Sequence, residues 1–185
     1  NRTMKQFLLI AFFFNIQYSI INSQSIVPSK ISFAGMRLKI TEGARKKIQA
    51  DVDRLTRSKT FVRKIAGRAD LYFPIIERIF KEKGVPNDFK FLVLQESSLI
   101  SDAVSSSNAV GFWQFKKESA IEVGLRVDDI MDERMNIVAS TYGASRYLLR
   151  NNFFFKNWIF SLLSYNLGLY GAKDLINLKY VGAQK

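Results

Sequence analysis

The chain has 185 residues, of which 48% are hydrophobic, and its formal net charge at neutral pH is +12. This length allows one domain with a substantial core, and this composition excludes an intrinsically disordered chain. The sequence contains neither His nor Cys, which excludes disulfides, Ser-His triads, cysteine nucleophiles and the usual zinc sites. We therefore expect no cofactor and no metal.

Residues 1–23 have the pattern of a secretory signal peptide. Lys5 precedes the apolar run Phe7–Phe14, and polar residues follow by Ser23. We interpret residues 1–3 as an upstream artefact and place cleavage near Ser23. Cleavage would lower the net charge from +12 to +10 by removing Arg2 and Lys5, and it predicts a protein of the periplasm or cell envelope. A retained N-terminal anchor is the alternative.

Excess positive charge favours an acidic polymer as partner. Peptidoglycan, with its peptide carboxylates, and nucleic acid, with its phosphates, both qualify. The basic residues are dispersed, with no DNA- or RNA-binding motif, and an export signal argues against nucleic acid. A solvated helix face is the plainer interpretation of any single one of them.

Residues 24–70 are predicted to be an N-terminal linker and helical region. Residues 25–35 are expected to be extended, and strand character is limited to short pieces near 31–40. Thr41 is predicted to cap a helix that reaches about Arg57, with a short helix over 61–66 after it. The apolar spacing of the first helix gives it an inner stripe of Ile48, Val52 and Leu55.

A further helix is predicted from Asp70 as its cap, with Pro74 near its start, to Gly84 just past its end. Its inward residues are expected to be Tyr72, Ile75, Ile76, Ile79 and Phe80.

The next helix carries the most informative carboxylate. Asn87 is predicted as its N-cap, with Asp88 in the first turn. Spacings of three and four place Phe89, Leu92, Val93 and Glu96 on one face. A carboxyl group at the end of an apolar stripe should have a raised pKa, as a general acid requires. The alternative is a half-solvated Glu96 at the helix end with no role.

A small polar loop, Ser105–Asn108, leads to Gly111 and then to an aromatic segment. Phe112, Trp113 and Phe115 surround the amide of Gln114. Flat apolar rings beside hydrogen-bonding groups suit a sugar ring. The alternative is that these rings are core, and we expect that of at least one of them.

Three more helices complete the chain. Residues 117–123 form a short helix closed by Gly124, and the acidic segment 127–135 is irregular. Asn136 is predicted to cap a helix to about Arg150, and residues 158–165 form a helix ended by Gly168. The expected buried residues of the long helix are Val138, Tyr142, Ala144 and Leu148.

Three short motifs carry a resemblance to a known family: Glu96-Ser97, Gly111–Gln114, and Ser164–Asn166 with Gly168. In this order and at these separations they resemble the signature motifs of the lytic transglycosylase (SLT) domain, the goose-type-lysozyme-like fold that cuts bacterial peptidoglycan. The resemblance covers about residues 31–185. Phe112 replaces the commoner Leu, and Asn108 stands where Gly is usual; Asn tolerates a left-handed conformation.

The resemblance implies a mainly α fold. It predicts a lysozyme-like helical domain with a substrate groove over residues 71–185, preceded by a short helical N-terminal region. Because relatives continue with at least one more helix, we expect this domain to be truncated at its C-terminus.

The resemblance also implies the chemistry. Glu96 would protonate the oxygen between N-acetylmuramic acid and N-acetylglucosamine, the muramic N-acetyl group would stabilise the charge at C1, and Glu96 would then take the C6 hydroxyl proton. The product is a 1,6-anhydro ring. Ser97 and Tyr165 would position Glu96 or the acetyl group, and Gln114 and Asn166 would hydrogen-bond sugar.

Ser105, Gly111 and Trp113 complete the residues expected to bind or position substrate, Gly111 by letting a backbone approach. A C-terminal helix cap is the alternative role of Asn166.

The predicted partner is the peptidoglycan glycan strand, bound by a monomer with possible envelope association. Three alternatives remain: a hydrolytic muramidase of the same fold with a second acid, a non-catalytic peptidoglycan-binding protein, and a cationic nucleic-acid binder. Asp102 and Glu118 are the other carboxylates near the motifs.

Overall fold

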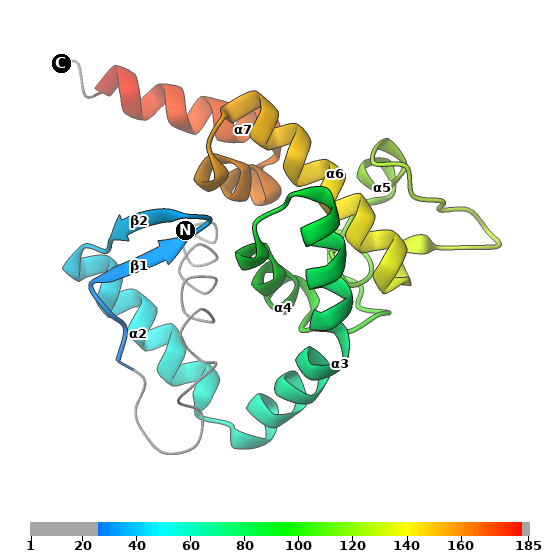
Figure 1. Ribbon diagram of the computed structural model, residues 1–185, viewed down its shortest axis with the longest axis horizontal. Coiled ribbons are helices and arrows are strands. Elements are labelled where there is room, and N and C mark those ends of the chain that lie inside the picture. The colour runs from blue at the N-terminus through cyan, green and yellow to red at the C-terminus, as the bar shows by residue number, and fades with distance from the viewer. Residues whose placement is uncertain (1–25, 183–185) are drawn as a thin grey trace.

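The computed structural model describes residues 26–182, with side chains up to residue 177, so the predicted signal peptide lies outside the described residues. Within this range the fold is mainly α, as predicted. It comprises a two-stranded sheet, six α-helices and two 3-10 helices (Figure 1), in the order β1 (Lys30–Phe33), β2 (Met36–Lys39), α2 (Glu42–Thr56), α3 (Lys59–Lys83), η2 (Asn87–Phe91), α4 (Leu92–Ser97), α5 (Lys117–Glu122), η3 (Glu133–Met135), α6 (Ile137–Phe155) and α7 (Trp158–Gly182).

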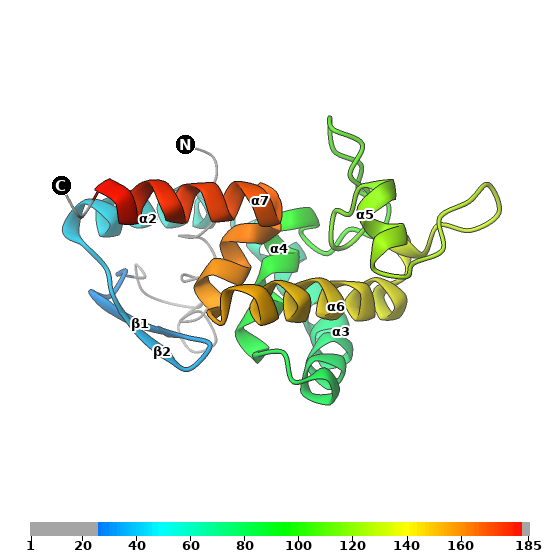
Figure 2. The ribbon, with the colours of Figure 1, turned by 90° about the horizontal axis from the view of Figure 1, so that it is seen from above.

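The hairpin β1–β2 and helix α2 lie at one end of the molecule, opposite α5 (Figures 1 and 2). The strands pair antiparallel from Lys30↔Lys39 to Phe33↔Met36. Thr41 caps α2 as predicted, since its side chain accepts a hydrogen bond from the Ala44 amide. This end has a small core of its own, consisting of Val27, Ile48 and Val52, while Leu55 is only half-buried.

Helix α3 corrects the prediction of two helices between residues 61 and 84. It runs without interruption for 25 residues, and Asp70 caps nothing because Ser58 is the N-cap. Pro74 lies inside the helix, where it removes a backbone hydrogen bond. Ile76 and Phe80 on the same helix are fully buried, and this packing outweighs the local cost. Gly84 ends the helix with φ 73°, as predicted.

The helix that carries Glu96 also begins differently from the prediction. Residues 87–91 form the 3-10 helix η2, and Asn87 is not its cap. The Asp88 carboxylate instead accepts a hydrogen bond from the amide of Ala34, in the tight turn between β1 and β2. The ring of Phe33 packs on Phe89 at 5.1 Å between centroids. These two contacts attach the hairpin to the main core.

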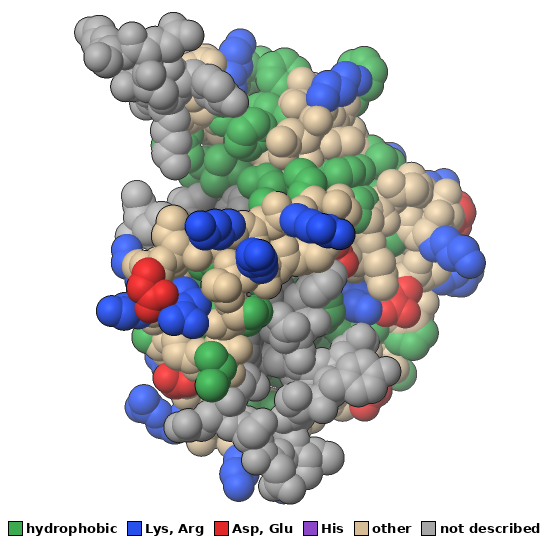
Figure 3. All heavy atoms as spheres, turned by 60° about the vertical axis from the view of Figure 1, so that its left-hand side comes forward, with side chains coloured by type: hydrophobic (Ala, Val, Ile, Leu, Met, Phe, Trp, Pro, Cys, Tyr) green, Lys and Arg blue, Asp and Glu red, His purple; other side chains and the backbone are tan. Residues whose placement is uncertain are grey.

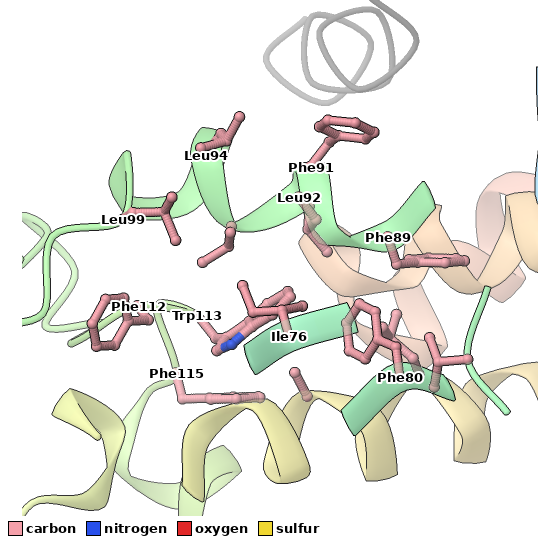
Figure 4. Packing of buried hydrophobic residues seen from close by; sticks show 14 of the residues in the cluster. Ile76, Phe80, Phe89, Phe91, Leu92, Leu94, Leu99, Phe112, Trp113 and Phe115 are labelled. Carbon is pink, nitrogen blue, oxygen red and sulfur yellow. The ribbon is translucent and has the colours of Figure 1, made fainter. Parts of the chain in front are cut away.

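The main core lies between α3, α4, α6 and the segment 111–115 (Figure 4). Phe89, Leu92, Val93 and Trp113 are fully buried in it, so the predicted apolar face of the Glu96 helix is confirmed. A buried Lys90 is accommodated by an ion pair with Glu77 and by the rings of Phe73 and Phe91. Residues 89–97 are therefore held both by their packing in the core and by the contacts of Lys90.

Helices α6 and α7 pack against each other and close the core. Asn136 caps α6 through hydrogen bonds from the amides of Val138 and Ala139. Ala144 and Leu148 are buried as predicted and Tyr142 is half-buried, but Val138 is 37% exposed because it lies in the first turn, beyond the core.

The helix that begins at Trp158 was predicted to end at Gly168, and this is only partly correct. Gly168 has non-helical φ and ψ of 70° and 167°, which produce a kink, and the chain then resumes a helical course to Gly182. After the kink α7 extends toward the side of the molecule on which α2 lies (Figures 1 and 2).

Basic side chains are spread over the face that includes α2 and the hairpin, and acidic ones are fewer there (Figure 3). The helices of the described range include none with both the length and the apolar character needed to cross a bilayer.

Candidate active site

Glu96 lies in the last turn of α4, at the end of the buried face formed by Phe89, Leu92 and Val93. Its Oε1 is buried and has no hydrogen-bond partner among the described residues. Burial raises the pKa of Glu96 from 4.5 to about 7. The direction agrees with the prediction, and a carboxyl group with this pKa is about half protonated at neutral pH, so it can donate its proton.

The segment 111–114 is held by hydrogen bonds to two successive backbone carbonyls. The hydroxyl of Ser97, next to Glu96, donates to the Phe112 carbonyl at 2.8 Å. The hydroxyl of Tyr165, on α7, donates to the Trp113 carbonyl at 2.8 Å. The three motifs found in the sequence therefore meet in space, with the aromatic segment between α4 and α7.

Tyr165 is close enough to Glu96 for the charge of Glu96 to affect it. The pKa of Tyr165 is raised well above its usual value, mainly by burial and further by the negative charge of Glu96. The phenol therefore stays neutral. Its single proton is directed at the Trp113 carbonyl, which leaves the oxygen lone pairs as acceptors. Its ring contacts those of Tyr147 and Phe115.

Gly111 is required by a close approach of two backbone segments. Its φ is 84°, in the left-handed region, and a Cβ at this position would lie 2.0 Å from the carbonyl oxygen of Arg134. Arg134 is itself fixed by a bidentate pair with Asp132, at 2.8 and 2.6 Å, and donates to the Phe115 carbonyl. Any larger side chain at Gly111 would displace this arrangement.

Gln114 braces the same turn. Its φ is 50°, and its side-chain nitrogen donates to the carbonyls of Ala103 and Gly111, both at 3.0 Å. The side-chain nitrogen is thus used within the loop, and a hydrogen bond from Gln114 to sugar stays a prediction.

Ser105 organises the loop that precedes Gly111. Its Oγ accepts hydrogen bonds from the amides of Ser107 and Ala109 at 3.3 and 3.0 Å. Asn108 has φ 60°, so it adopts the left-handed conformation that the sequence predicted for it.

The aromatic rings expected to face sugar are core instead. Phe112, Trp113 and Phe115 are exposed by 2%, 0% and 4%, and they point into the space between α3, α4 and α6 (Figure 4). The indole nitrogen of Trp113 donates to the hydroxyl of Thr141 at 3.0 Å. The expectation that at least one of these rings is core is therefore confirmed, and it holds for all three. The backbone carbonyl of Trp113 accepts the hydrogen bond from Tyr165.

Asn166 is half-buried, two residues before the kink at Gly168. Its side chain makes no hydrogen bond with the other described residues, whether of the capping kind or otherwise. The neighbouring Ser164 accepts a hydrogen bond from Asn151 at 2.7 Å and joins α7 to α6.

Three residues that support the site were not identified from the sequence: Arg134, Thr141 and Arg68. Arg68 donates to the carbonyl of Ser98, in the turn that follows Glu96. For Arg134 the sequence offered one signal: Asp132, a possible ion-pair partner, lies two residues away in the segment predicted to be acidic and irregular.

Asp102 and Glu118, the other carboxylates considered, are both exposed. The Asp and Glu side chains of residues 26–177 nowhere gather in a group of three or more that could hold a metal ion. Glu96 is thus the acid whose surroundings suit proton transfer.

A mainly helical domain with an acid of raised pKa beside a braced aromatic segment fits the lysozyme-like class of fold. Residues 73–184 match the profile of the family described as "Transglycosylase SLT domain", and the chain belongs to this family.

Two curated relatives, each called membrane-bound lytic murein transglycosylase D and each from a strain of Escherichia coli, are 28% identical over 138 residues. The alignment covers 74% of this chain but 30% of each relative, so the chain spans less than a third of their length.

Proposed function

We propose that this domain cleaves the bond from N-acetylmuramic acid to N-acetylglucosamine in peptidoglycan without adding water. The family profile supports the substrate class, and the names of the two relatives support murein as the polymer. The observation that carries the reaction type is the carboxyl group of Glu96, whose Oε1 is buried with no partner among the described residues and whose pKa is raised to about 7.

In the proposed reaction Glu96 donates its proton to the glycosidic oxygen as the bond from that oxygen to C1 breaks. The muramic N-acetyl oxygen stabilises the positive charge at C1. The C6 hydroxyl oxygen then bonds to C1, and its proton returns to Glu96. One bond breaks and one forms, the acid is regenerated, and no water is consumed. Hydrolysis would instead need a second carboxylate to activate water.

We propose supporting roles for the other motif residues on the basis of their contacts near Glu96. Ser97 and Tyr165 fix the Phe112 and Trp113 carbonyls, and so set the position of the loop relative to Glu96. Gly111 and Gln114 give that loop its shape, and Ser105 shapes the segment before it. Asn166, whose amide is not used within the described fold, is the proposed direct contact with sugar.

We also propose export to the periplasm or envelope on the basis of residues 1–23, and a catalytic unit over 71–185. Helix α3 runs through the boundary at residue 70, so the N-terminal region and the catalytic unit would share one rigid element.

The reaction type can be tested by digestion in water enriched in heavy oxygen. A lytic reaction leaves the label out of the new muramic end, whereas hydrolysis inserts one labelled oxygen at C1. Labelled products would replace this proposal with the hydrolytic alternative, and failure to cleave any peptidoglycan preparation would favour a binding role.

A further inference from the structure

A pocket of about 420 Å³ lies on the surface of α3, next to the turn that follows Glu96. Arg63, Lys64 and Arg68 line it from one side, at positions that bring them to one face of the helix. Leu71 and Ile100, which are 63% and 37% exposed, add apolar surface. The pocket therefore combines cationic and aliphatic groups.

Within the described part of the chain, no ion pair neutralises the charge of this pocket. Its lining includes no Asp or Glu, and the ion pairs of the described residues include none with Arg63, Lys64 or Arg68. Among the described residues Arg68 makes one hydrogen bond, from Nη1 to the Ser98 carbonyl at 3.1 Å, which holds the guanidinium at the pocket edge. Such a site attracts an anion.

The pocket adjoins the turn that directly follows Glu96. Ser98 ends α4 two residues after Glu96, and both Ser98 and Leu99 have positive φ, of 53° and 59°. Two consecutive non-glycine residues in the left-handed region are strained, and Arg68 braces this turn by holding the Ser98 carbonyl. A ligand in the pocket would thus lie beside the turn that positions Glu96.

We propose that this pocket receives the anionic stem peptide of the glycan strand that is cleaved at Glu96. A peptide carboxylate would pair with Arg63 and Lys64, and aliphatic side chains of the peptide would lie against Leu71 and Ile100. A phosphate-bearing polymer would use the charges but leave the apolar surface unpaired, which favours the peptide. The inference rests on the proposed function, because it assumes that peptidoglycan is the substrate.

The test compares two substrates: intact glycan strands, and the same strands freed of stem peptides by an amidase. The unmodified protein should cleave the intact strands faster, by roughly two- to thirtyfold if each of the two exposed ion pairs contributes within its usual range. In the double variant R63A/K64A this ratio of rates should fall to about one. Arg68 is kept because it also braces the turn.

The matched control removes two exposed charges elsewhere. Lys46 and Lys47 lie on α2, and K46A/K47A lowers the net charge by the same amount as R63A/K64A. This control should keep the preference for intact strands. Loss of the preference in both double variants would show general electrostatic attraction and would overturn the proposal that this pocket binds the stem peptide.

A binding measurement separates this inference from the proposed function. The free stem peptide released by the amidase is titrated into Glu96→Gln protein by calorimetry, with and without R63A/K64A. Binding that depends on Arg63 and Lys64 supports the pocket. If both substrates are cleaved equally to anhydro products and no peptide binds, the assignment of the pocket to the stem peptide is overturned, while the proposed reaction is supported. No cleavage of either substrate, with peptide bound, overturns the reaction alone.

Discussion

The hydroxyl of Tyr165 donates a hydrogen bond to the backbone carbonyl of Trp113 at 2.8 Å, across 52 positions of the sequence. The contact joins α7 to the segment that lies beside α4, and Ser97 makes the equivalent contact with the preceding carbonyl. Two of the three motifs are therefore braces for the third. Because Ser97 directly follows Glu96, these hydrogen bonds fix the aromatic segment next to the proposed acid.

Tyr165→Phe should destabilise the fold because it leaves the Trp113 carbonyl without its partner. We expect a loss of roughly 1–3 kcal/mol in the free energy of unfolding, together with a loss of activity. Urea unfolding followed by circular dichroism measures the former. Tyr142→Phe is the matched control, since the Tyr142 hydroxyl contacts the exposed Glu82 and its loss should have little effect. Equal stability of the two variants would contradict a bracing role.

Glu96→Gln should abolish cleavage while the protein stays folded. Loss of a general acid typically costs about 10²- to 10⁴-fold in rate, and Gln has nearly the same shape as a protonated Glu. Turbidity loss of a peptidoglycan suspension is the assay. Asp102→Asn and Glu118→Gln are the controls, because both carboxylates are exposed and should keep activity. Substantial activity in Glu96→Gln would remove the catalytic assignment.

The pH dependence of stability should reveal the buried carboxyl group. Glu96 titrates near 4.5 when unfolded and near 7 when folded, so between these values the folded state holds a proton that the unfolded state has released. The contribution of Glu96 to stability therefore falls as pH rises from about 4.5 to about 7. The free energy of unfolding of Glu96→Gln should lack this decline, and the difference from the unmodified protein should reach at most about 3 kcal/mol.

Activity should follow the same titration. Cleavage needs the protonated acid, so the rate should fall about tenfold per pH unit above a midpoint near 7. A midpoint near 4.5 would mean that Glu96 is solvated, contrary to its burial.

Local chemistry allowed parts of the fold to be predicted from the sequence. Thr41 and Asn136 cap helices through their own side chains, and Gly84 ends α3 because it adopts a left-handed conformation cheaply. The apolar face that ends at Glu96 follows from helical spacing, and the burial it predicts raises the pKa of Glu96. These inferences depend on residues within a few positions of one another.

Contacts between distant segments could not be predicted in this way. Pro74 stays inside α3 because Ile76 and Phe80 pack in the core, which no local rule foresees. From the sequence alone, the ring of Trp113 could equally well contact sugar or lie in the core. In the structure it lies in the core, where its indole N–H donates to Thr141, 28 positions away. The residue type alone therefore cannot separate a binding surface from a buried one.

The need for glycine at 111 is another long-range effect. Gly111→Ala should destabilise the protein by about 3 kcal/mol or more, because its Cβ would overlap the Arg134 carbonyl and its φ is positive. Gly67→Ala is the control: the position lies within α3 with nothing near its Cβ, so the change should stabilise by roughly 0.5–1 kcal/mol. Thermal unfolding compares the two. A Gly111→Ala protein as stable as the parent would contradict the close approach.

The most direct test of the central claim is the mass of the muropeptides released from purified peptidoglycan. The account predicts muramic ends that are lighter than hydrolysis products by one water molecule, that resist reduction by borohydride, and that are absent with Glu96→Gln. Release of reducing muramic ends throughout would contradict it. A second acid, such as Asp102 or Glu118, would then have to activate water.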